Sequence, residues 1–280
     1  MRDEEEATDG PPDPQLHPER SPGFGEDPVG LEDIEVDRDV TIGEASLDEL
    51  AASDTEPVED DTLDDLLTLL TGDDAVERRL AALGLAERDP TERTVRALAR
   101  AATTDDDAEV RQFAVEALAK QGDGDGLAAE TACALTDDPE PWVRAEAVVS
   151  LDRLDRATHE QVIERKLDDD HHAVRRNALV SLFKHRGENA LPELLAAAED
   201  PSERVREWSA HLLGGVDDDR ADETLRAIRA DESEPDIVRK TAAKALEVDA
   251  GSFRRQFSGT LAETDRTLPG EDALNRTPNL

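Results

Sequence analysis

The residues with the greatest capacity for chemistry lie together in one short stretch, DDDHHAVRRNALVSL, at positions 168–182. Three aspartates come directly before two adjacent histidines, His171 and His172. Imidazole and carboxylate groups are common protein ligands of zinc and related transition metals. The same stretch also has the form of a polar turn followed by an apolar helix. A metal site and a helix start are therefore the two interpretations to separate.

Other reactive groups are sparse. The single cysteine, Cys133, lies in the apolar stretch GLAAETACALT, so we expect neither an intramolecular disulfide nor a cysteine-based zinc site. One His-Glu dipeptide occurs, at His159 and Glu160. Gly-rich phosphate loops and a G-x-S-x-G elbow are absent from the sequence. Neighbouring carboxylates are uninformative in a chain with 70 acidic residues. We therefore predict no catalytic residue, no metal and no cofactor.

A repeated segment organises most of the chain. Five copies align without gaps, and their starts are 33, 31, 31 and 33 residues apart. The copies are VRQFAVEAL (110–118), VRAEAVVSL (143–151), VRRNALVSL (174–182), VREWSAHLL (205–213) and VRKTAAKAL (238–246), with a degenerate sixth copy, ERRLAALGL (77–85), upstream. Because an amphipathic segment separates each copy from the next, every repeat is predicted to be a pair of helices.

The alignment decides between the two interpretations of the histidines. His171 and His172 occupy turn positions that hold Asp, Ala, Glu, Pro or Ser in the other copies, so the repeat requires no ligand there. No further His or Cys lies at a helical spacing from them. We predict the start of a helix and no metal site.

Charged residues also recur at fixed places. An arginine follows the valine in every aligned copy, and an aspartate stands five residues before the valine in four copies. Since the arginine lies at the flank of the packed helix face, we expect a ladder in which it bonds these aspartates or the turn carbonyls. The members of this structural ladder are Asp105, Arg111, Asp138, Arg144, Asp169, Arg175, Asp200, Arg206 and Arg239.

The pattern of an Asp followed by V-R-x-x-A-x-x-x-L resembles the HEAT family, in its short variant known from phycobilisome lyases, over about two thirds of the chain. The resemblance implies an all-α fold, a right-handed α-solenoid of about six HEAT-like helix pairs. Deoxyhypusine hydroxylase shares the repeat, but its diiron centre uses several His-Glu dipeptides, and this chain has one. A bilin lyase-like or other HEAT-repeat enzyme is the alternative to a binding function.

A binding function fits the repeats better than catalysis. Solenoids present an extended surface to partners. If the valine that begins each repeated segment is counted as place 0, the residues at places 2, 6 and 9 point away from the packed helix face. We predict a non-catalytic scaffold or adaptor for protein partners. The family resemblance implies a role in signalling or taxis, because relatives in salt-adapted archaea include taxis adaptors. The predicted groove has an apolar middle and a basic end, and it comprises Ala145, Val149, Arg176, Val180, Phe183, His211, Lys240 and Lys244.

Charge limits the class of partner. A formal net charge of −38 disfavours binding to nucleic acid and to anionic membranes. The Asp-rich, Lys-poor composition resembles that of proteins from halophilic archaea, where salt screens the repulsion between carboxylates. Neither a signal peptide nor an apolar run of membrane-spanning length is found, so we expect a cytoplasmic protein.

The predicted domain organisation has three parts. Residues 1–58 are rich in Asp, Glu, Pro and Gly and are expected to form a disordered acidic tail. Residues 59–250 form the repeat domain, and residues 251–280 form a terminal helical segment with a disordered end. Because the tail also carries Leu47 and Leu50, we expect an intramolecular contact between the tail and the groove.

Overall fold

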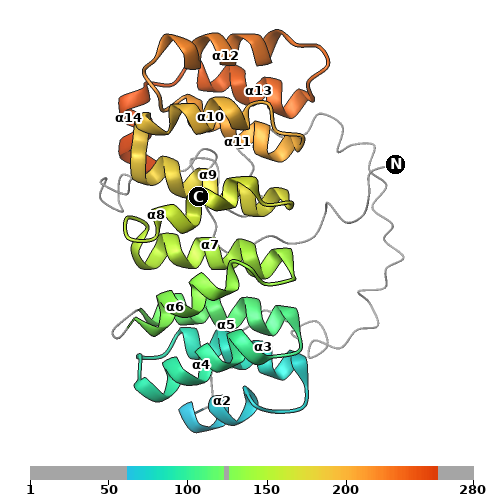
Figure 1. Ribbon diagram of the computed structural model, residues 1–280, viewed down its shortest axis with the longest axis vertical. Helices are drawn as coiled ribbons and strands as arrows, with labels where there is room; N and C mark the ends of the chain where they lie inside the picture. The colour runs from blue at the N-terminus through green and yellow to red at the C-terminus, as the bar shows by residue number, and fades with distance from the viewer. Residues whose placement is uncertain (1–61, 123–125, 258–280) are drawn as a thin grey trace, which may run out of the picture. The chain divides into compact units, whose positions relative to one another are not determined.

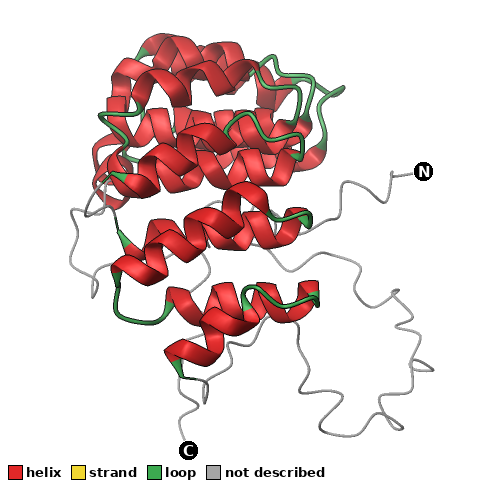
Figure 2. Ribbon diagram, turned by 60° about the horizontal axis from the view of Figure 1, so that its bottom comes forward, coloured by secondary structure: helices red, strands yellow, loops and turns green. Residues whose placement is uncertain are grey.

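Helices built on the repeated segments make up the fold. A computed structural model describes residues 62–122 and 126–257, and every regular element in these ranges is a helix. The described residues divide into two compact units, an N-terminal unit up to residue 154 and a C-terminal unit from residue 155. Within each unit the helices are arranged in successive pairs (Figures 1 and 2).

The N-terminal unit contains three helix pairs. Their bounds are α2 (Leu63–Leu69) with α3 (Ala75–Ala86), α4 (Glu92–Thr104) with α5 (Ala108–Gln121), and α6 (Leu127–Leu135) with α7 (Pro141–Asp155). Side-chain caps fix several helix starts. Asp107, for example, accepts a hydrogen bond from the Val110 amide at 3.0 Å and caps α5. The polar turns seen in the sequence thus act as helix starts.

The C-terminal unit contains three further pairs and one additional helix. The pairs are α8 (Glu160–Arg165), extended by the 3-10 helix η4 (Lys166–Asp168), with α9 (His172–Arg186); α10 (Leu191–Ala197), preceded by the 3-10 helix η5 (Gly187–Ala190), with α11 (Glu203–Leu213); and α12 (Asp219–Ala230) with α13 (Asp236–Ala245). The helix α14 (Ala250–Phe257) follows the last pair.

First and second helices of the pairs form separate layers within a unit. Second helices contact the next second helix, as α3 does α5 and α9 does α11, and first helices contact first helices, as α4 does α6. The core lies between the layers. Val110, Ala114 and Leu118, at places 0, 4 and 8 of one segment, are each fully buried, as the helical period requires.

The predicted fold class is confirmed. Six helix pairs are found in the described residues, and each repeated segment forms a second helix. The first helix among the described residues, α2, begins after Thr62, which forms a capping box with Asp65. The predicted limit between tail and repeat domain, at residues 58 and 59, lies outside the described residues, as does the chain beyond Phe257.

Candidate interaction surface

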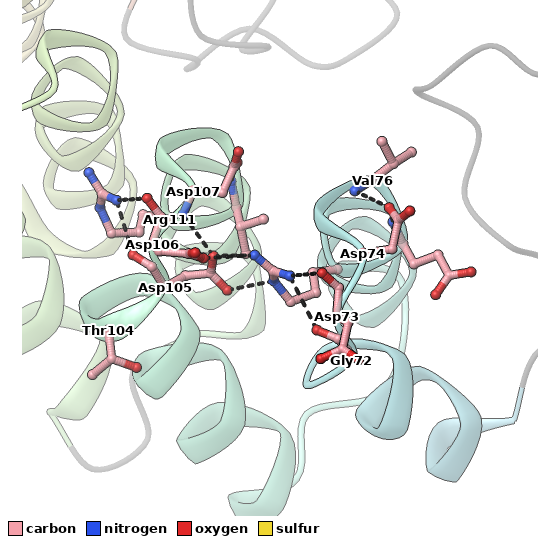
Figure 3. A network of polar contacts seen from close by, with 12 residues as sticks. Gly72, Asp73, Asp74, Val76, Thr104, Asp105, Asp106, Asp107 and Arg111 are labelled. Atoms are coloured by element: carbon pink, nitrogen blue, oxygen red, sulfur yellow. Dashed lines mark hydrogen bonds and ion pairs between the residues drawn. The ribbon is translucent and has the colours of Figure 1, made fainter.

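In four of the described repeats, the ladder arginine binds an acid of the next repeat. Arg78, in the degenerate copy, donates from Nε and Nη2 to the two carboxylate oxygens of Asp105, both at 2.8 Å. Its Nη1 donates to the carbonyls of Gly72 at 3.2 Å and Asp73 at 3.0 Å. Asp105 Oδ1 also accepts from the Asp107 amide at 3.0 Å. Figure 3 shows this network, in which one guanidinium joins two consecutive turns.

The same geometry recurs along both units. The other pairs between consecutive repeats are Arg111 with Asp138 (2.9 Å), Arg175 with Asp200 (2.7 and 2.8 Å) and Arg206 with Glu234 (2.9 to 3.1 Å). Arg144 donates to the carbonyls of Asp138 and Pro139 at 3.0 and 3.2 Å, and Asp169 accepts from the His171 amide at 3.0 Å. The structure thus brings most of the predicted ladder together.

The hydrogen bonds of the ladder favour the charged forms of Asp105 and Arg111. Burial raises the pKa of the Asp105 carboxyl, but hydrogen bonds from Arg78 and the Asp107 amide outweigh burial, so the pKa lies below its usual value. The hydrogen bond to Asp138 raises the pKa of Arg111. The side chains of Arg111 and Asp138 are only 11% and 6% exposed. These pairs are suited to holding repeats together rather than to proton transfer.

The last ladder step departs from the sequence pattern. Glu234 is the acid that receives Arg206, and it stands four residues before Val238 instead of five. The longer glutamate side chain compensates for this one-residue displacement. Arg239 pairs with Asp236 on its own helix, and its buried Nε has no hydrogen-bond partner. A search for any acid within one place of the expected position would have found Glu234.

The two histidines of the opening stretch lie at the start of α9. Their rings are 4.5 Å apart, centroid to centroid. Desolvation, assisted by the charges of His171 and Arg176, lowers the pKa of His172 to about 4. Among the described residues, no group of three or more His, Cys, Asp or Glu side chains is placed to hold a metal ion.

The His-Glu dipeptide participates in an ion-pair cluster. Glu160 accepts from Arg186 Nε at 2.5 Å, and the hydrogen bond lowers the pKa of Glu160. The same guanidinium reaches Glu164 at 3.0 Å and Glu193 at 2.5 Å. Glu160 is therefore an ionised partner of Arg186 that helps to join α8, α9 and α10.

Most of the predicted groove is not an open surface. Ala145, Val149, Arg176, Val180 and Phe183 are at most 3% exposed. Arg176 donates to Asn177 Oδ1 at 3.1 and 3.0 Å, and burial lowers its pKa to about 10. Helix α9 packs against α11, and α14 covers Phe183. We expected an accessible apolar middle, whereas neighbouring helices bury these side chains.

The remaining groove residues keep some exposure. Lys240 is exposed and Lys244 is half-buried on α13, and His211 is half-buried on α11. Desolvation lowers the pKa of His211 to about 4, so its ring is neutral at neutral pH. The basic end of the predicted groove is thus partly accessible. The predicted contact with the N-terminal tail lies outside the described residues.

Aromatic rings gather where α14 meets α9 and α11. We call Phe183, Trp208 and His211 the aromatic face. The α14 ring of Phe253 lies 6.0 Å from Phe183 and 4.8 Å from His211, centroid to centroid. Phe257 lies 5.6 and 6.0 Å from the same two rings. Sequence periodicity did not reveal this cluster, because Phe253 is 70 residues away from Phe183.

A cleft with basic side chains borders this contact. Its volume is about 520 Å³, and it is lined by Phe183, Lys184, His185, Arg186, Gly187, Gly251, Arg254, Arg255 and Phe257. Arg254 donates to the Gly215 carbonyl at 2.6 Å and also pairs with Glu188. In the part of the chain that the structure describes, no helix is long and apolar enough to cross a membrane.

Several solved structures are similar to this chain. The complex of CpcE and CpcF of phycocyanin lyase from Nostoc sp. PCC7120 matches with a TM-score of 0.50 and 20% identity, covering 79% of this chain and 96% of that one. An engineered protein matches at 0.44 and 21% (65% and 94% covered). A computationally designed armadillo repeat protein for modular peptide recognition matches at 0.40 and 19% (66% and 99% covered).

Sequence comparison supplies the family. No curated protein matches the chain with significance. A profile of HEAT repeats matches residues 63–152, 129–195 and 160–247. These ranges contain the six helix pairs and all of the ladder. The chain belongs to the HEAT-repeat family.

Proposed function

We propose that the protein is a non-catalytic scaffold that binds protein segments on the side of its second helices. The observation that carries this proposal is α14, a helix outside the repeat pattern, which is seated against Phe183 on α9 and His211 on α11. This contact has the form of helix-in-groove recognition, in which apolar anchors of one helix enter a surface made by others. Signalling or taxis is the setting that the family resemblance suggests for such an adaptor.

Charge supports a protein partner that places acidic or neutral side chains against α13. The chain carries 70 acidic and 32 basic residues, yet the second helix α13, which packs against α11, carries the partly accessible side chains of Lys240 and Lys244. Opposed potentials of this kind orient partners and exclude incorrect ones. The ladder acids do not contribute to binding, because the arginines already occupy them.

Affinity capture with the purified full chain tests the proposal. The chain is immobilised at low salt and in molar KCl, and each recovered protein is purified and titrated against it by calorimetry. We expect a stoichiometric complex that is weakened at least about tenfold by Lys240→Glu/Lys244→Glu and unaffected by Arg226→Glu on the first helix α12. A purified chain that contains stoichiometric metal or a chromophore, and binds no protein, would instead favour an enzyme.

A further inference from the structure

The position of α14 differs from that of a helix that continues the repeat array. A helix that extended the array would pack on α12 and α13, the last pair. Instead, its two phenylalanines contact rings on α9 and α11, which lie two repeats and one repeat before the α12 and α13 pair. Figure 1 shows α14 at the side of the C-terminal unit, not beyond α12 and α13. Its sequence, AGSFRRQF, also lacks the Val-Arg start of the repeats.

The contact has a simple recognition pattern. Phe253 and Phe257 are four residues apart, so both rings project from one face of the helix. Arg254 supplies a polar anchor at the Gly215 carbonyl and Glu188. The fit is close, because a Cβ at Gly215 would lie 2.6 Å from both Phe183 Cζ and Phe253 Cδ1. The surface thus binds two aromatic side chains and one cationic side chain of α14.

The seated helix is also short enough to exchange. Eight residues do not form a stable helix alone in water, so the helical state of α14 depends on this surface. Two phenylalanine rings and the polar contacts of Arg254 join α14 to the rest of its unit. Phe257 remains half-buried. A longer partner helix with the same anchors would bury more surface and replace it.

We propose that the aromatic face is a binding site for a partner helix that carries two aromatic side chains four residues apart and an arginine next to the first. In the isolated chain α14 occupies this site, and the partner helix displaces it. This inference rests on the proposed scaffold function and specifies its binding surface. Because α14 competes within the same chain, the apparent partner affinity equals the intrinsic affinity multiplied by the fraction of time that the site is open.

A peptide with the chain's own α14 sequence provides the test. A fluorescent peptide of residues 247–260 is titrated into the full-length chain and into the full-length variant Phe253→Ala/Phe257→Ala, and binding is followed by anisotropy. We expect at least about tenfold tighter binding to the variant, because its own α14 no longer competes. A peptide with both phenylalanines replaced by alanine should not bind. Val248→Ala, at an exposed position just before α14, should behave as the unchanged chain.

Two further variants keep the result decisive. Arg254→Ala removes the polar anchor but keeps both rings, and it should tighten peptide binding about threefold even if the double variant fails to fold. Adding Gly215→Val to either variant should abolish binding, because its side chain would enter the ring contact. Equal affinity of the peptide for unchanged and altered chains, or equal binding of the alanine peptide, would overturn the proposal.

The peptide test is independent of the capture experiment. Failure to recover any partner, together with peptide binding as expected, would reject the scaffold function and leave the α14 site intact. Recovery of a partner that binds the unchanged chain and the Phe253→Ala/Phe257→Ala variant equally would retain the scaffold and reject this site.

Discussion

Single ladder arginines contribute more to stability than surface charges do. Arg111 makes four hydrogen bonds, two to Asp138 and two to turn carbonyls, in a largely buried setting. Arg111→Ala leaves Asp138 and the carbonyls without this donor, and should lower the free energy of unfolding by about 3 kcal/mol. Arg111→Lys should restore little, since an ammonium cannot reproduce the planar fork. Urea denaturation measures both.

An exposed ion pair provides the matched control. Arg226 and Asp222 are 2.6 Å apart on α12, with side chains 58% and 49% exposed. Arg226→Ala should cost less than about 0.5 kcal/mol. Equal losses in Arg111→Ala and Arg226→Ala would show that the ladder has no special structural role.

Two half-buried histidines make stability depend on pH. The pKa values of His172 and His211 are lowered to about 4, mainly by desolvation, from an ordinary value of 6.5. Between these limits the unfolded chain binds protons that the folded chain does not, so the free energy of unfolding falls as the pH drops from 6.5 to 4. His172→Gln and His211→Gln should each flatten this slope in urea titrations. An unchanged slope in both variants would contradict this explanation.

Close helix packing explains the small residues in the repeat. Ala178, at place 4 of α9, is fully buried. Ala178→Leu adds three carbons to a filled contact and should destabilise the chain by about 1–3 kcal/mol. Ala227→Leu, at an exposed position of α12, is the control and should change stability by less than about 0.5 kcal/mol. Thermal unfolding followed by circular dichroism distinguishes the two outcomes.

Helices and ladder were predictable because they depend on local spacing. A valine, a small residue and a leucine at places 0, 4 and 8 define a helix face whatever the surroundings. Arg111 and Asp138 recur at the repeat period, so their pairing follows from the stacking of repeats. The burial of Phe183 was not predictable in this way. It depends on α14, which returns across 70 residues and carries no repeat pattern.

Net charge affects the molecule as a whole. A formal charge of −38 produces self-repulsion that opposes the compact state. Ladder pairs such as Arg175 with Asp200 are largely shielded from solvent, so salt screens the repulsion more than it weakens them. The urea midpoint of unfolding should therefore rise as KCl increases from 0.05 M toward about 1 M. A midpoint that falls over this range would show that attractive surface pairs dominate.

The ladder also affects how repeats can be added to such a protein. In four described repeats, the arginine binds the turn of its own repeat and an acid of the next. Duplicated copies of such a repeat therefore fit together without redesign of the connection. Arg239 instead pairs with Asp236 on its own helix, and its buried Nε has no hydrogen-bond partner. If an additional repeat with an aspartate at the ladder position were inserted after α13, Arg239 would be available to bind that aspartate.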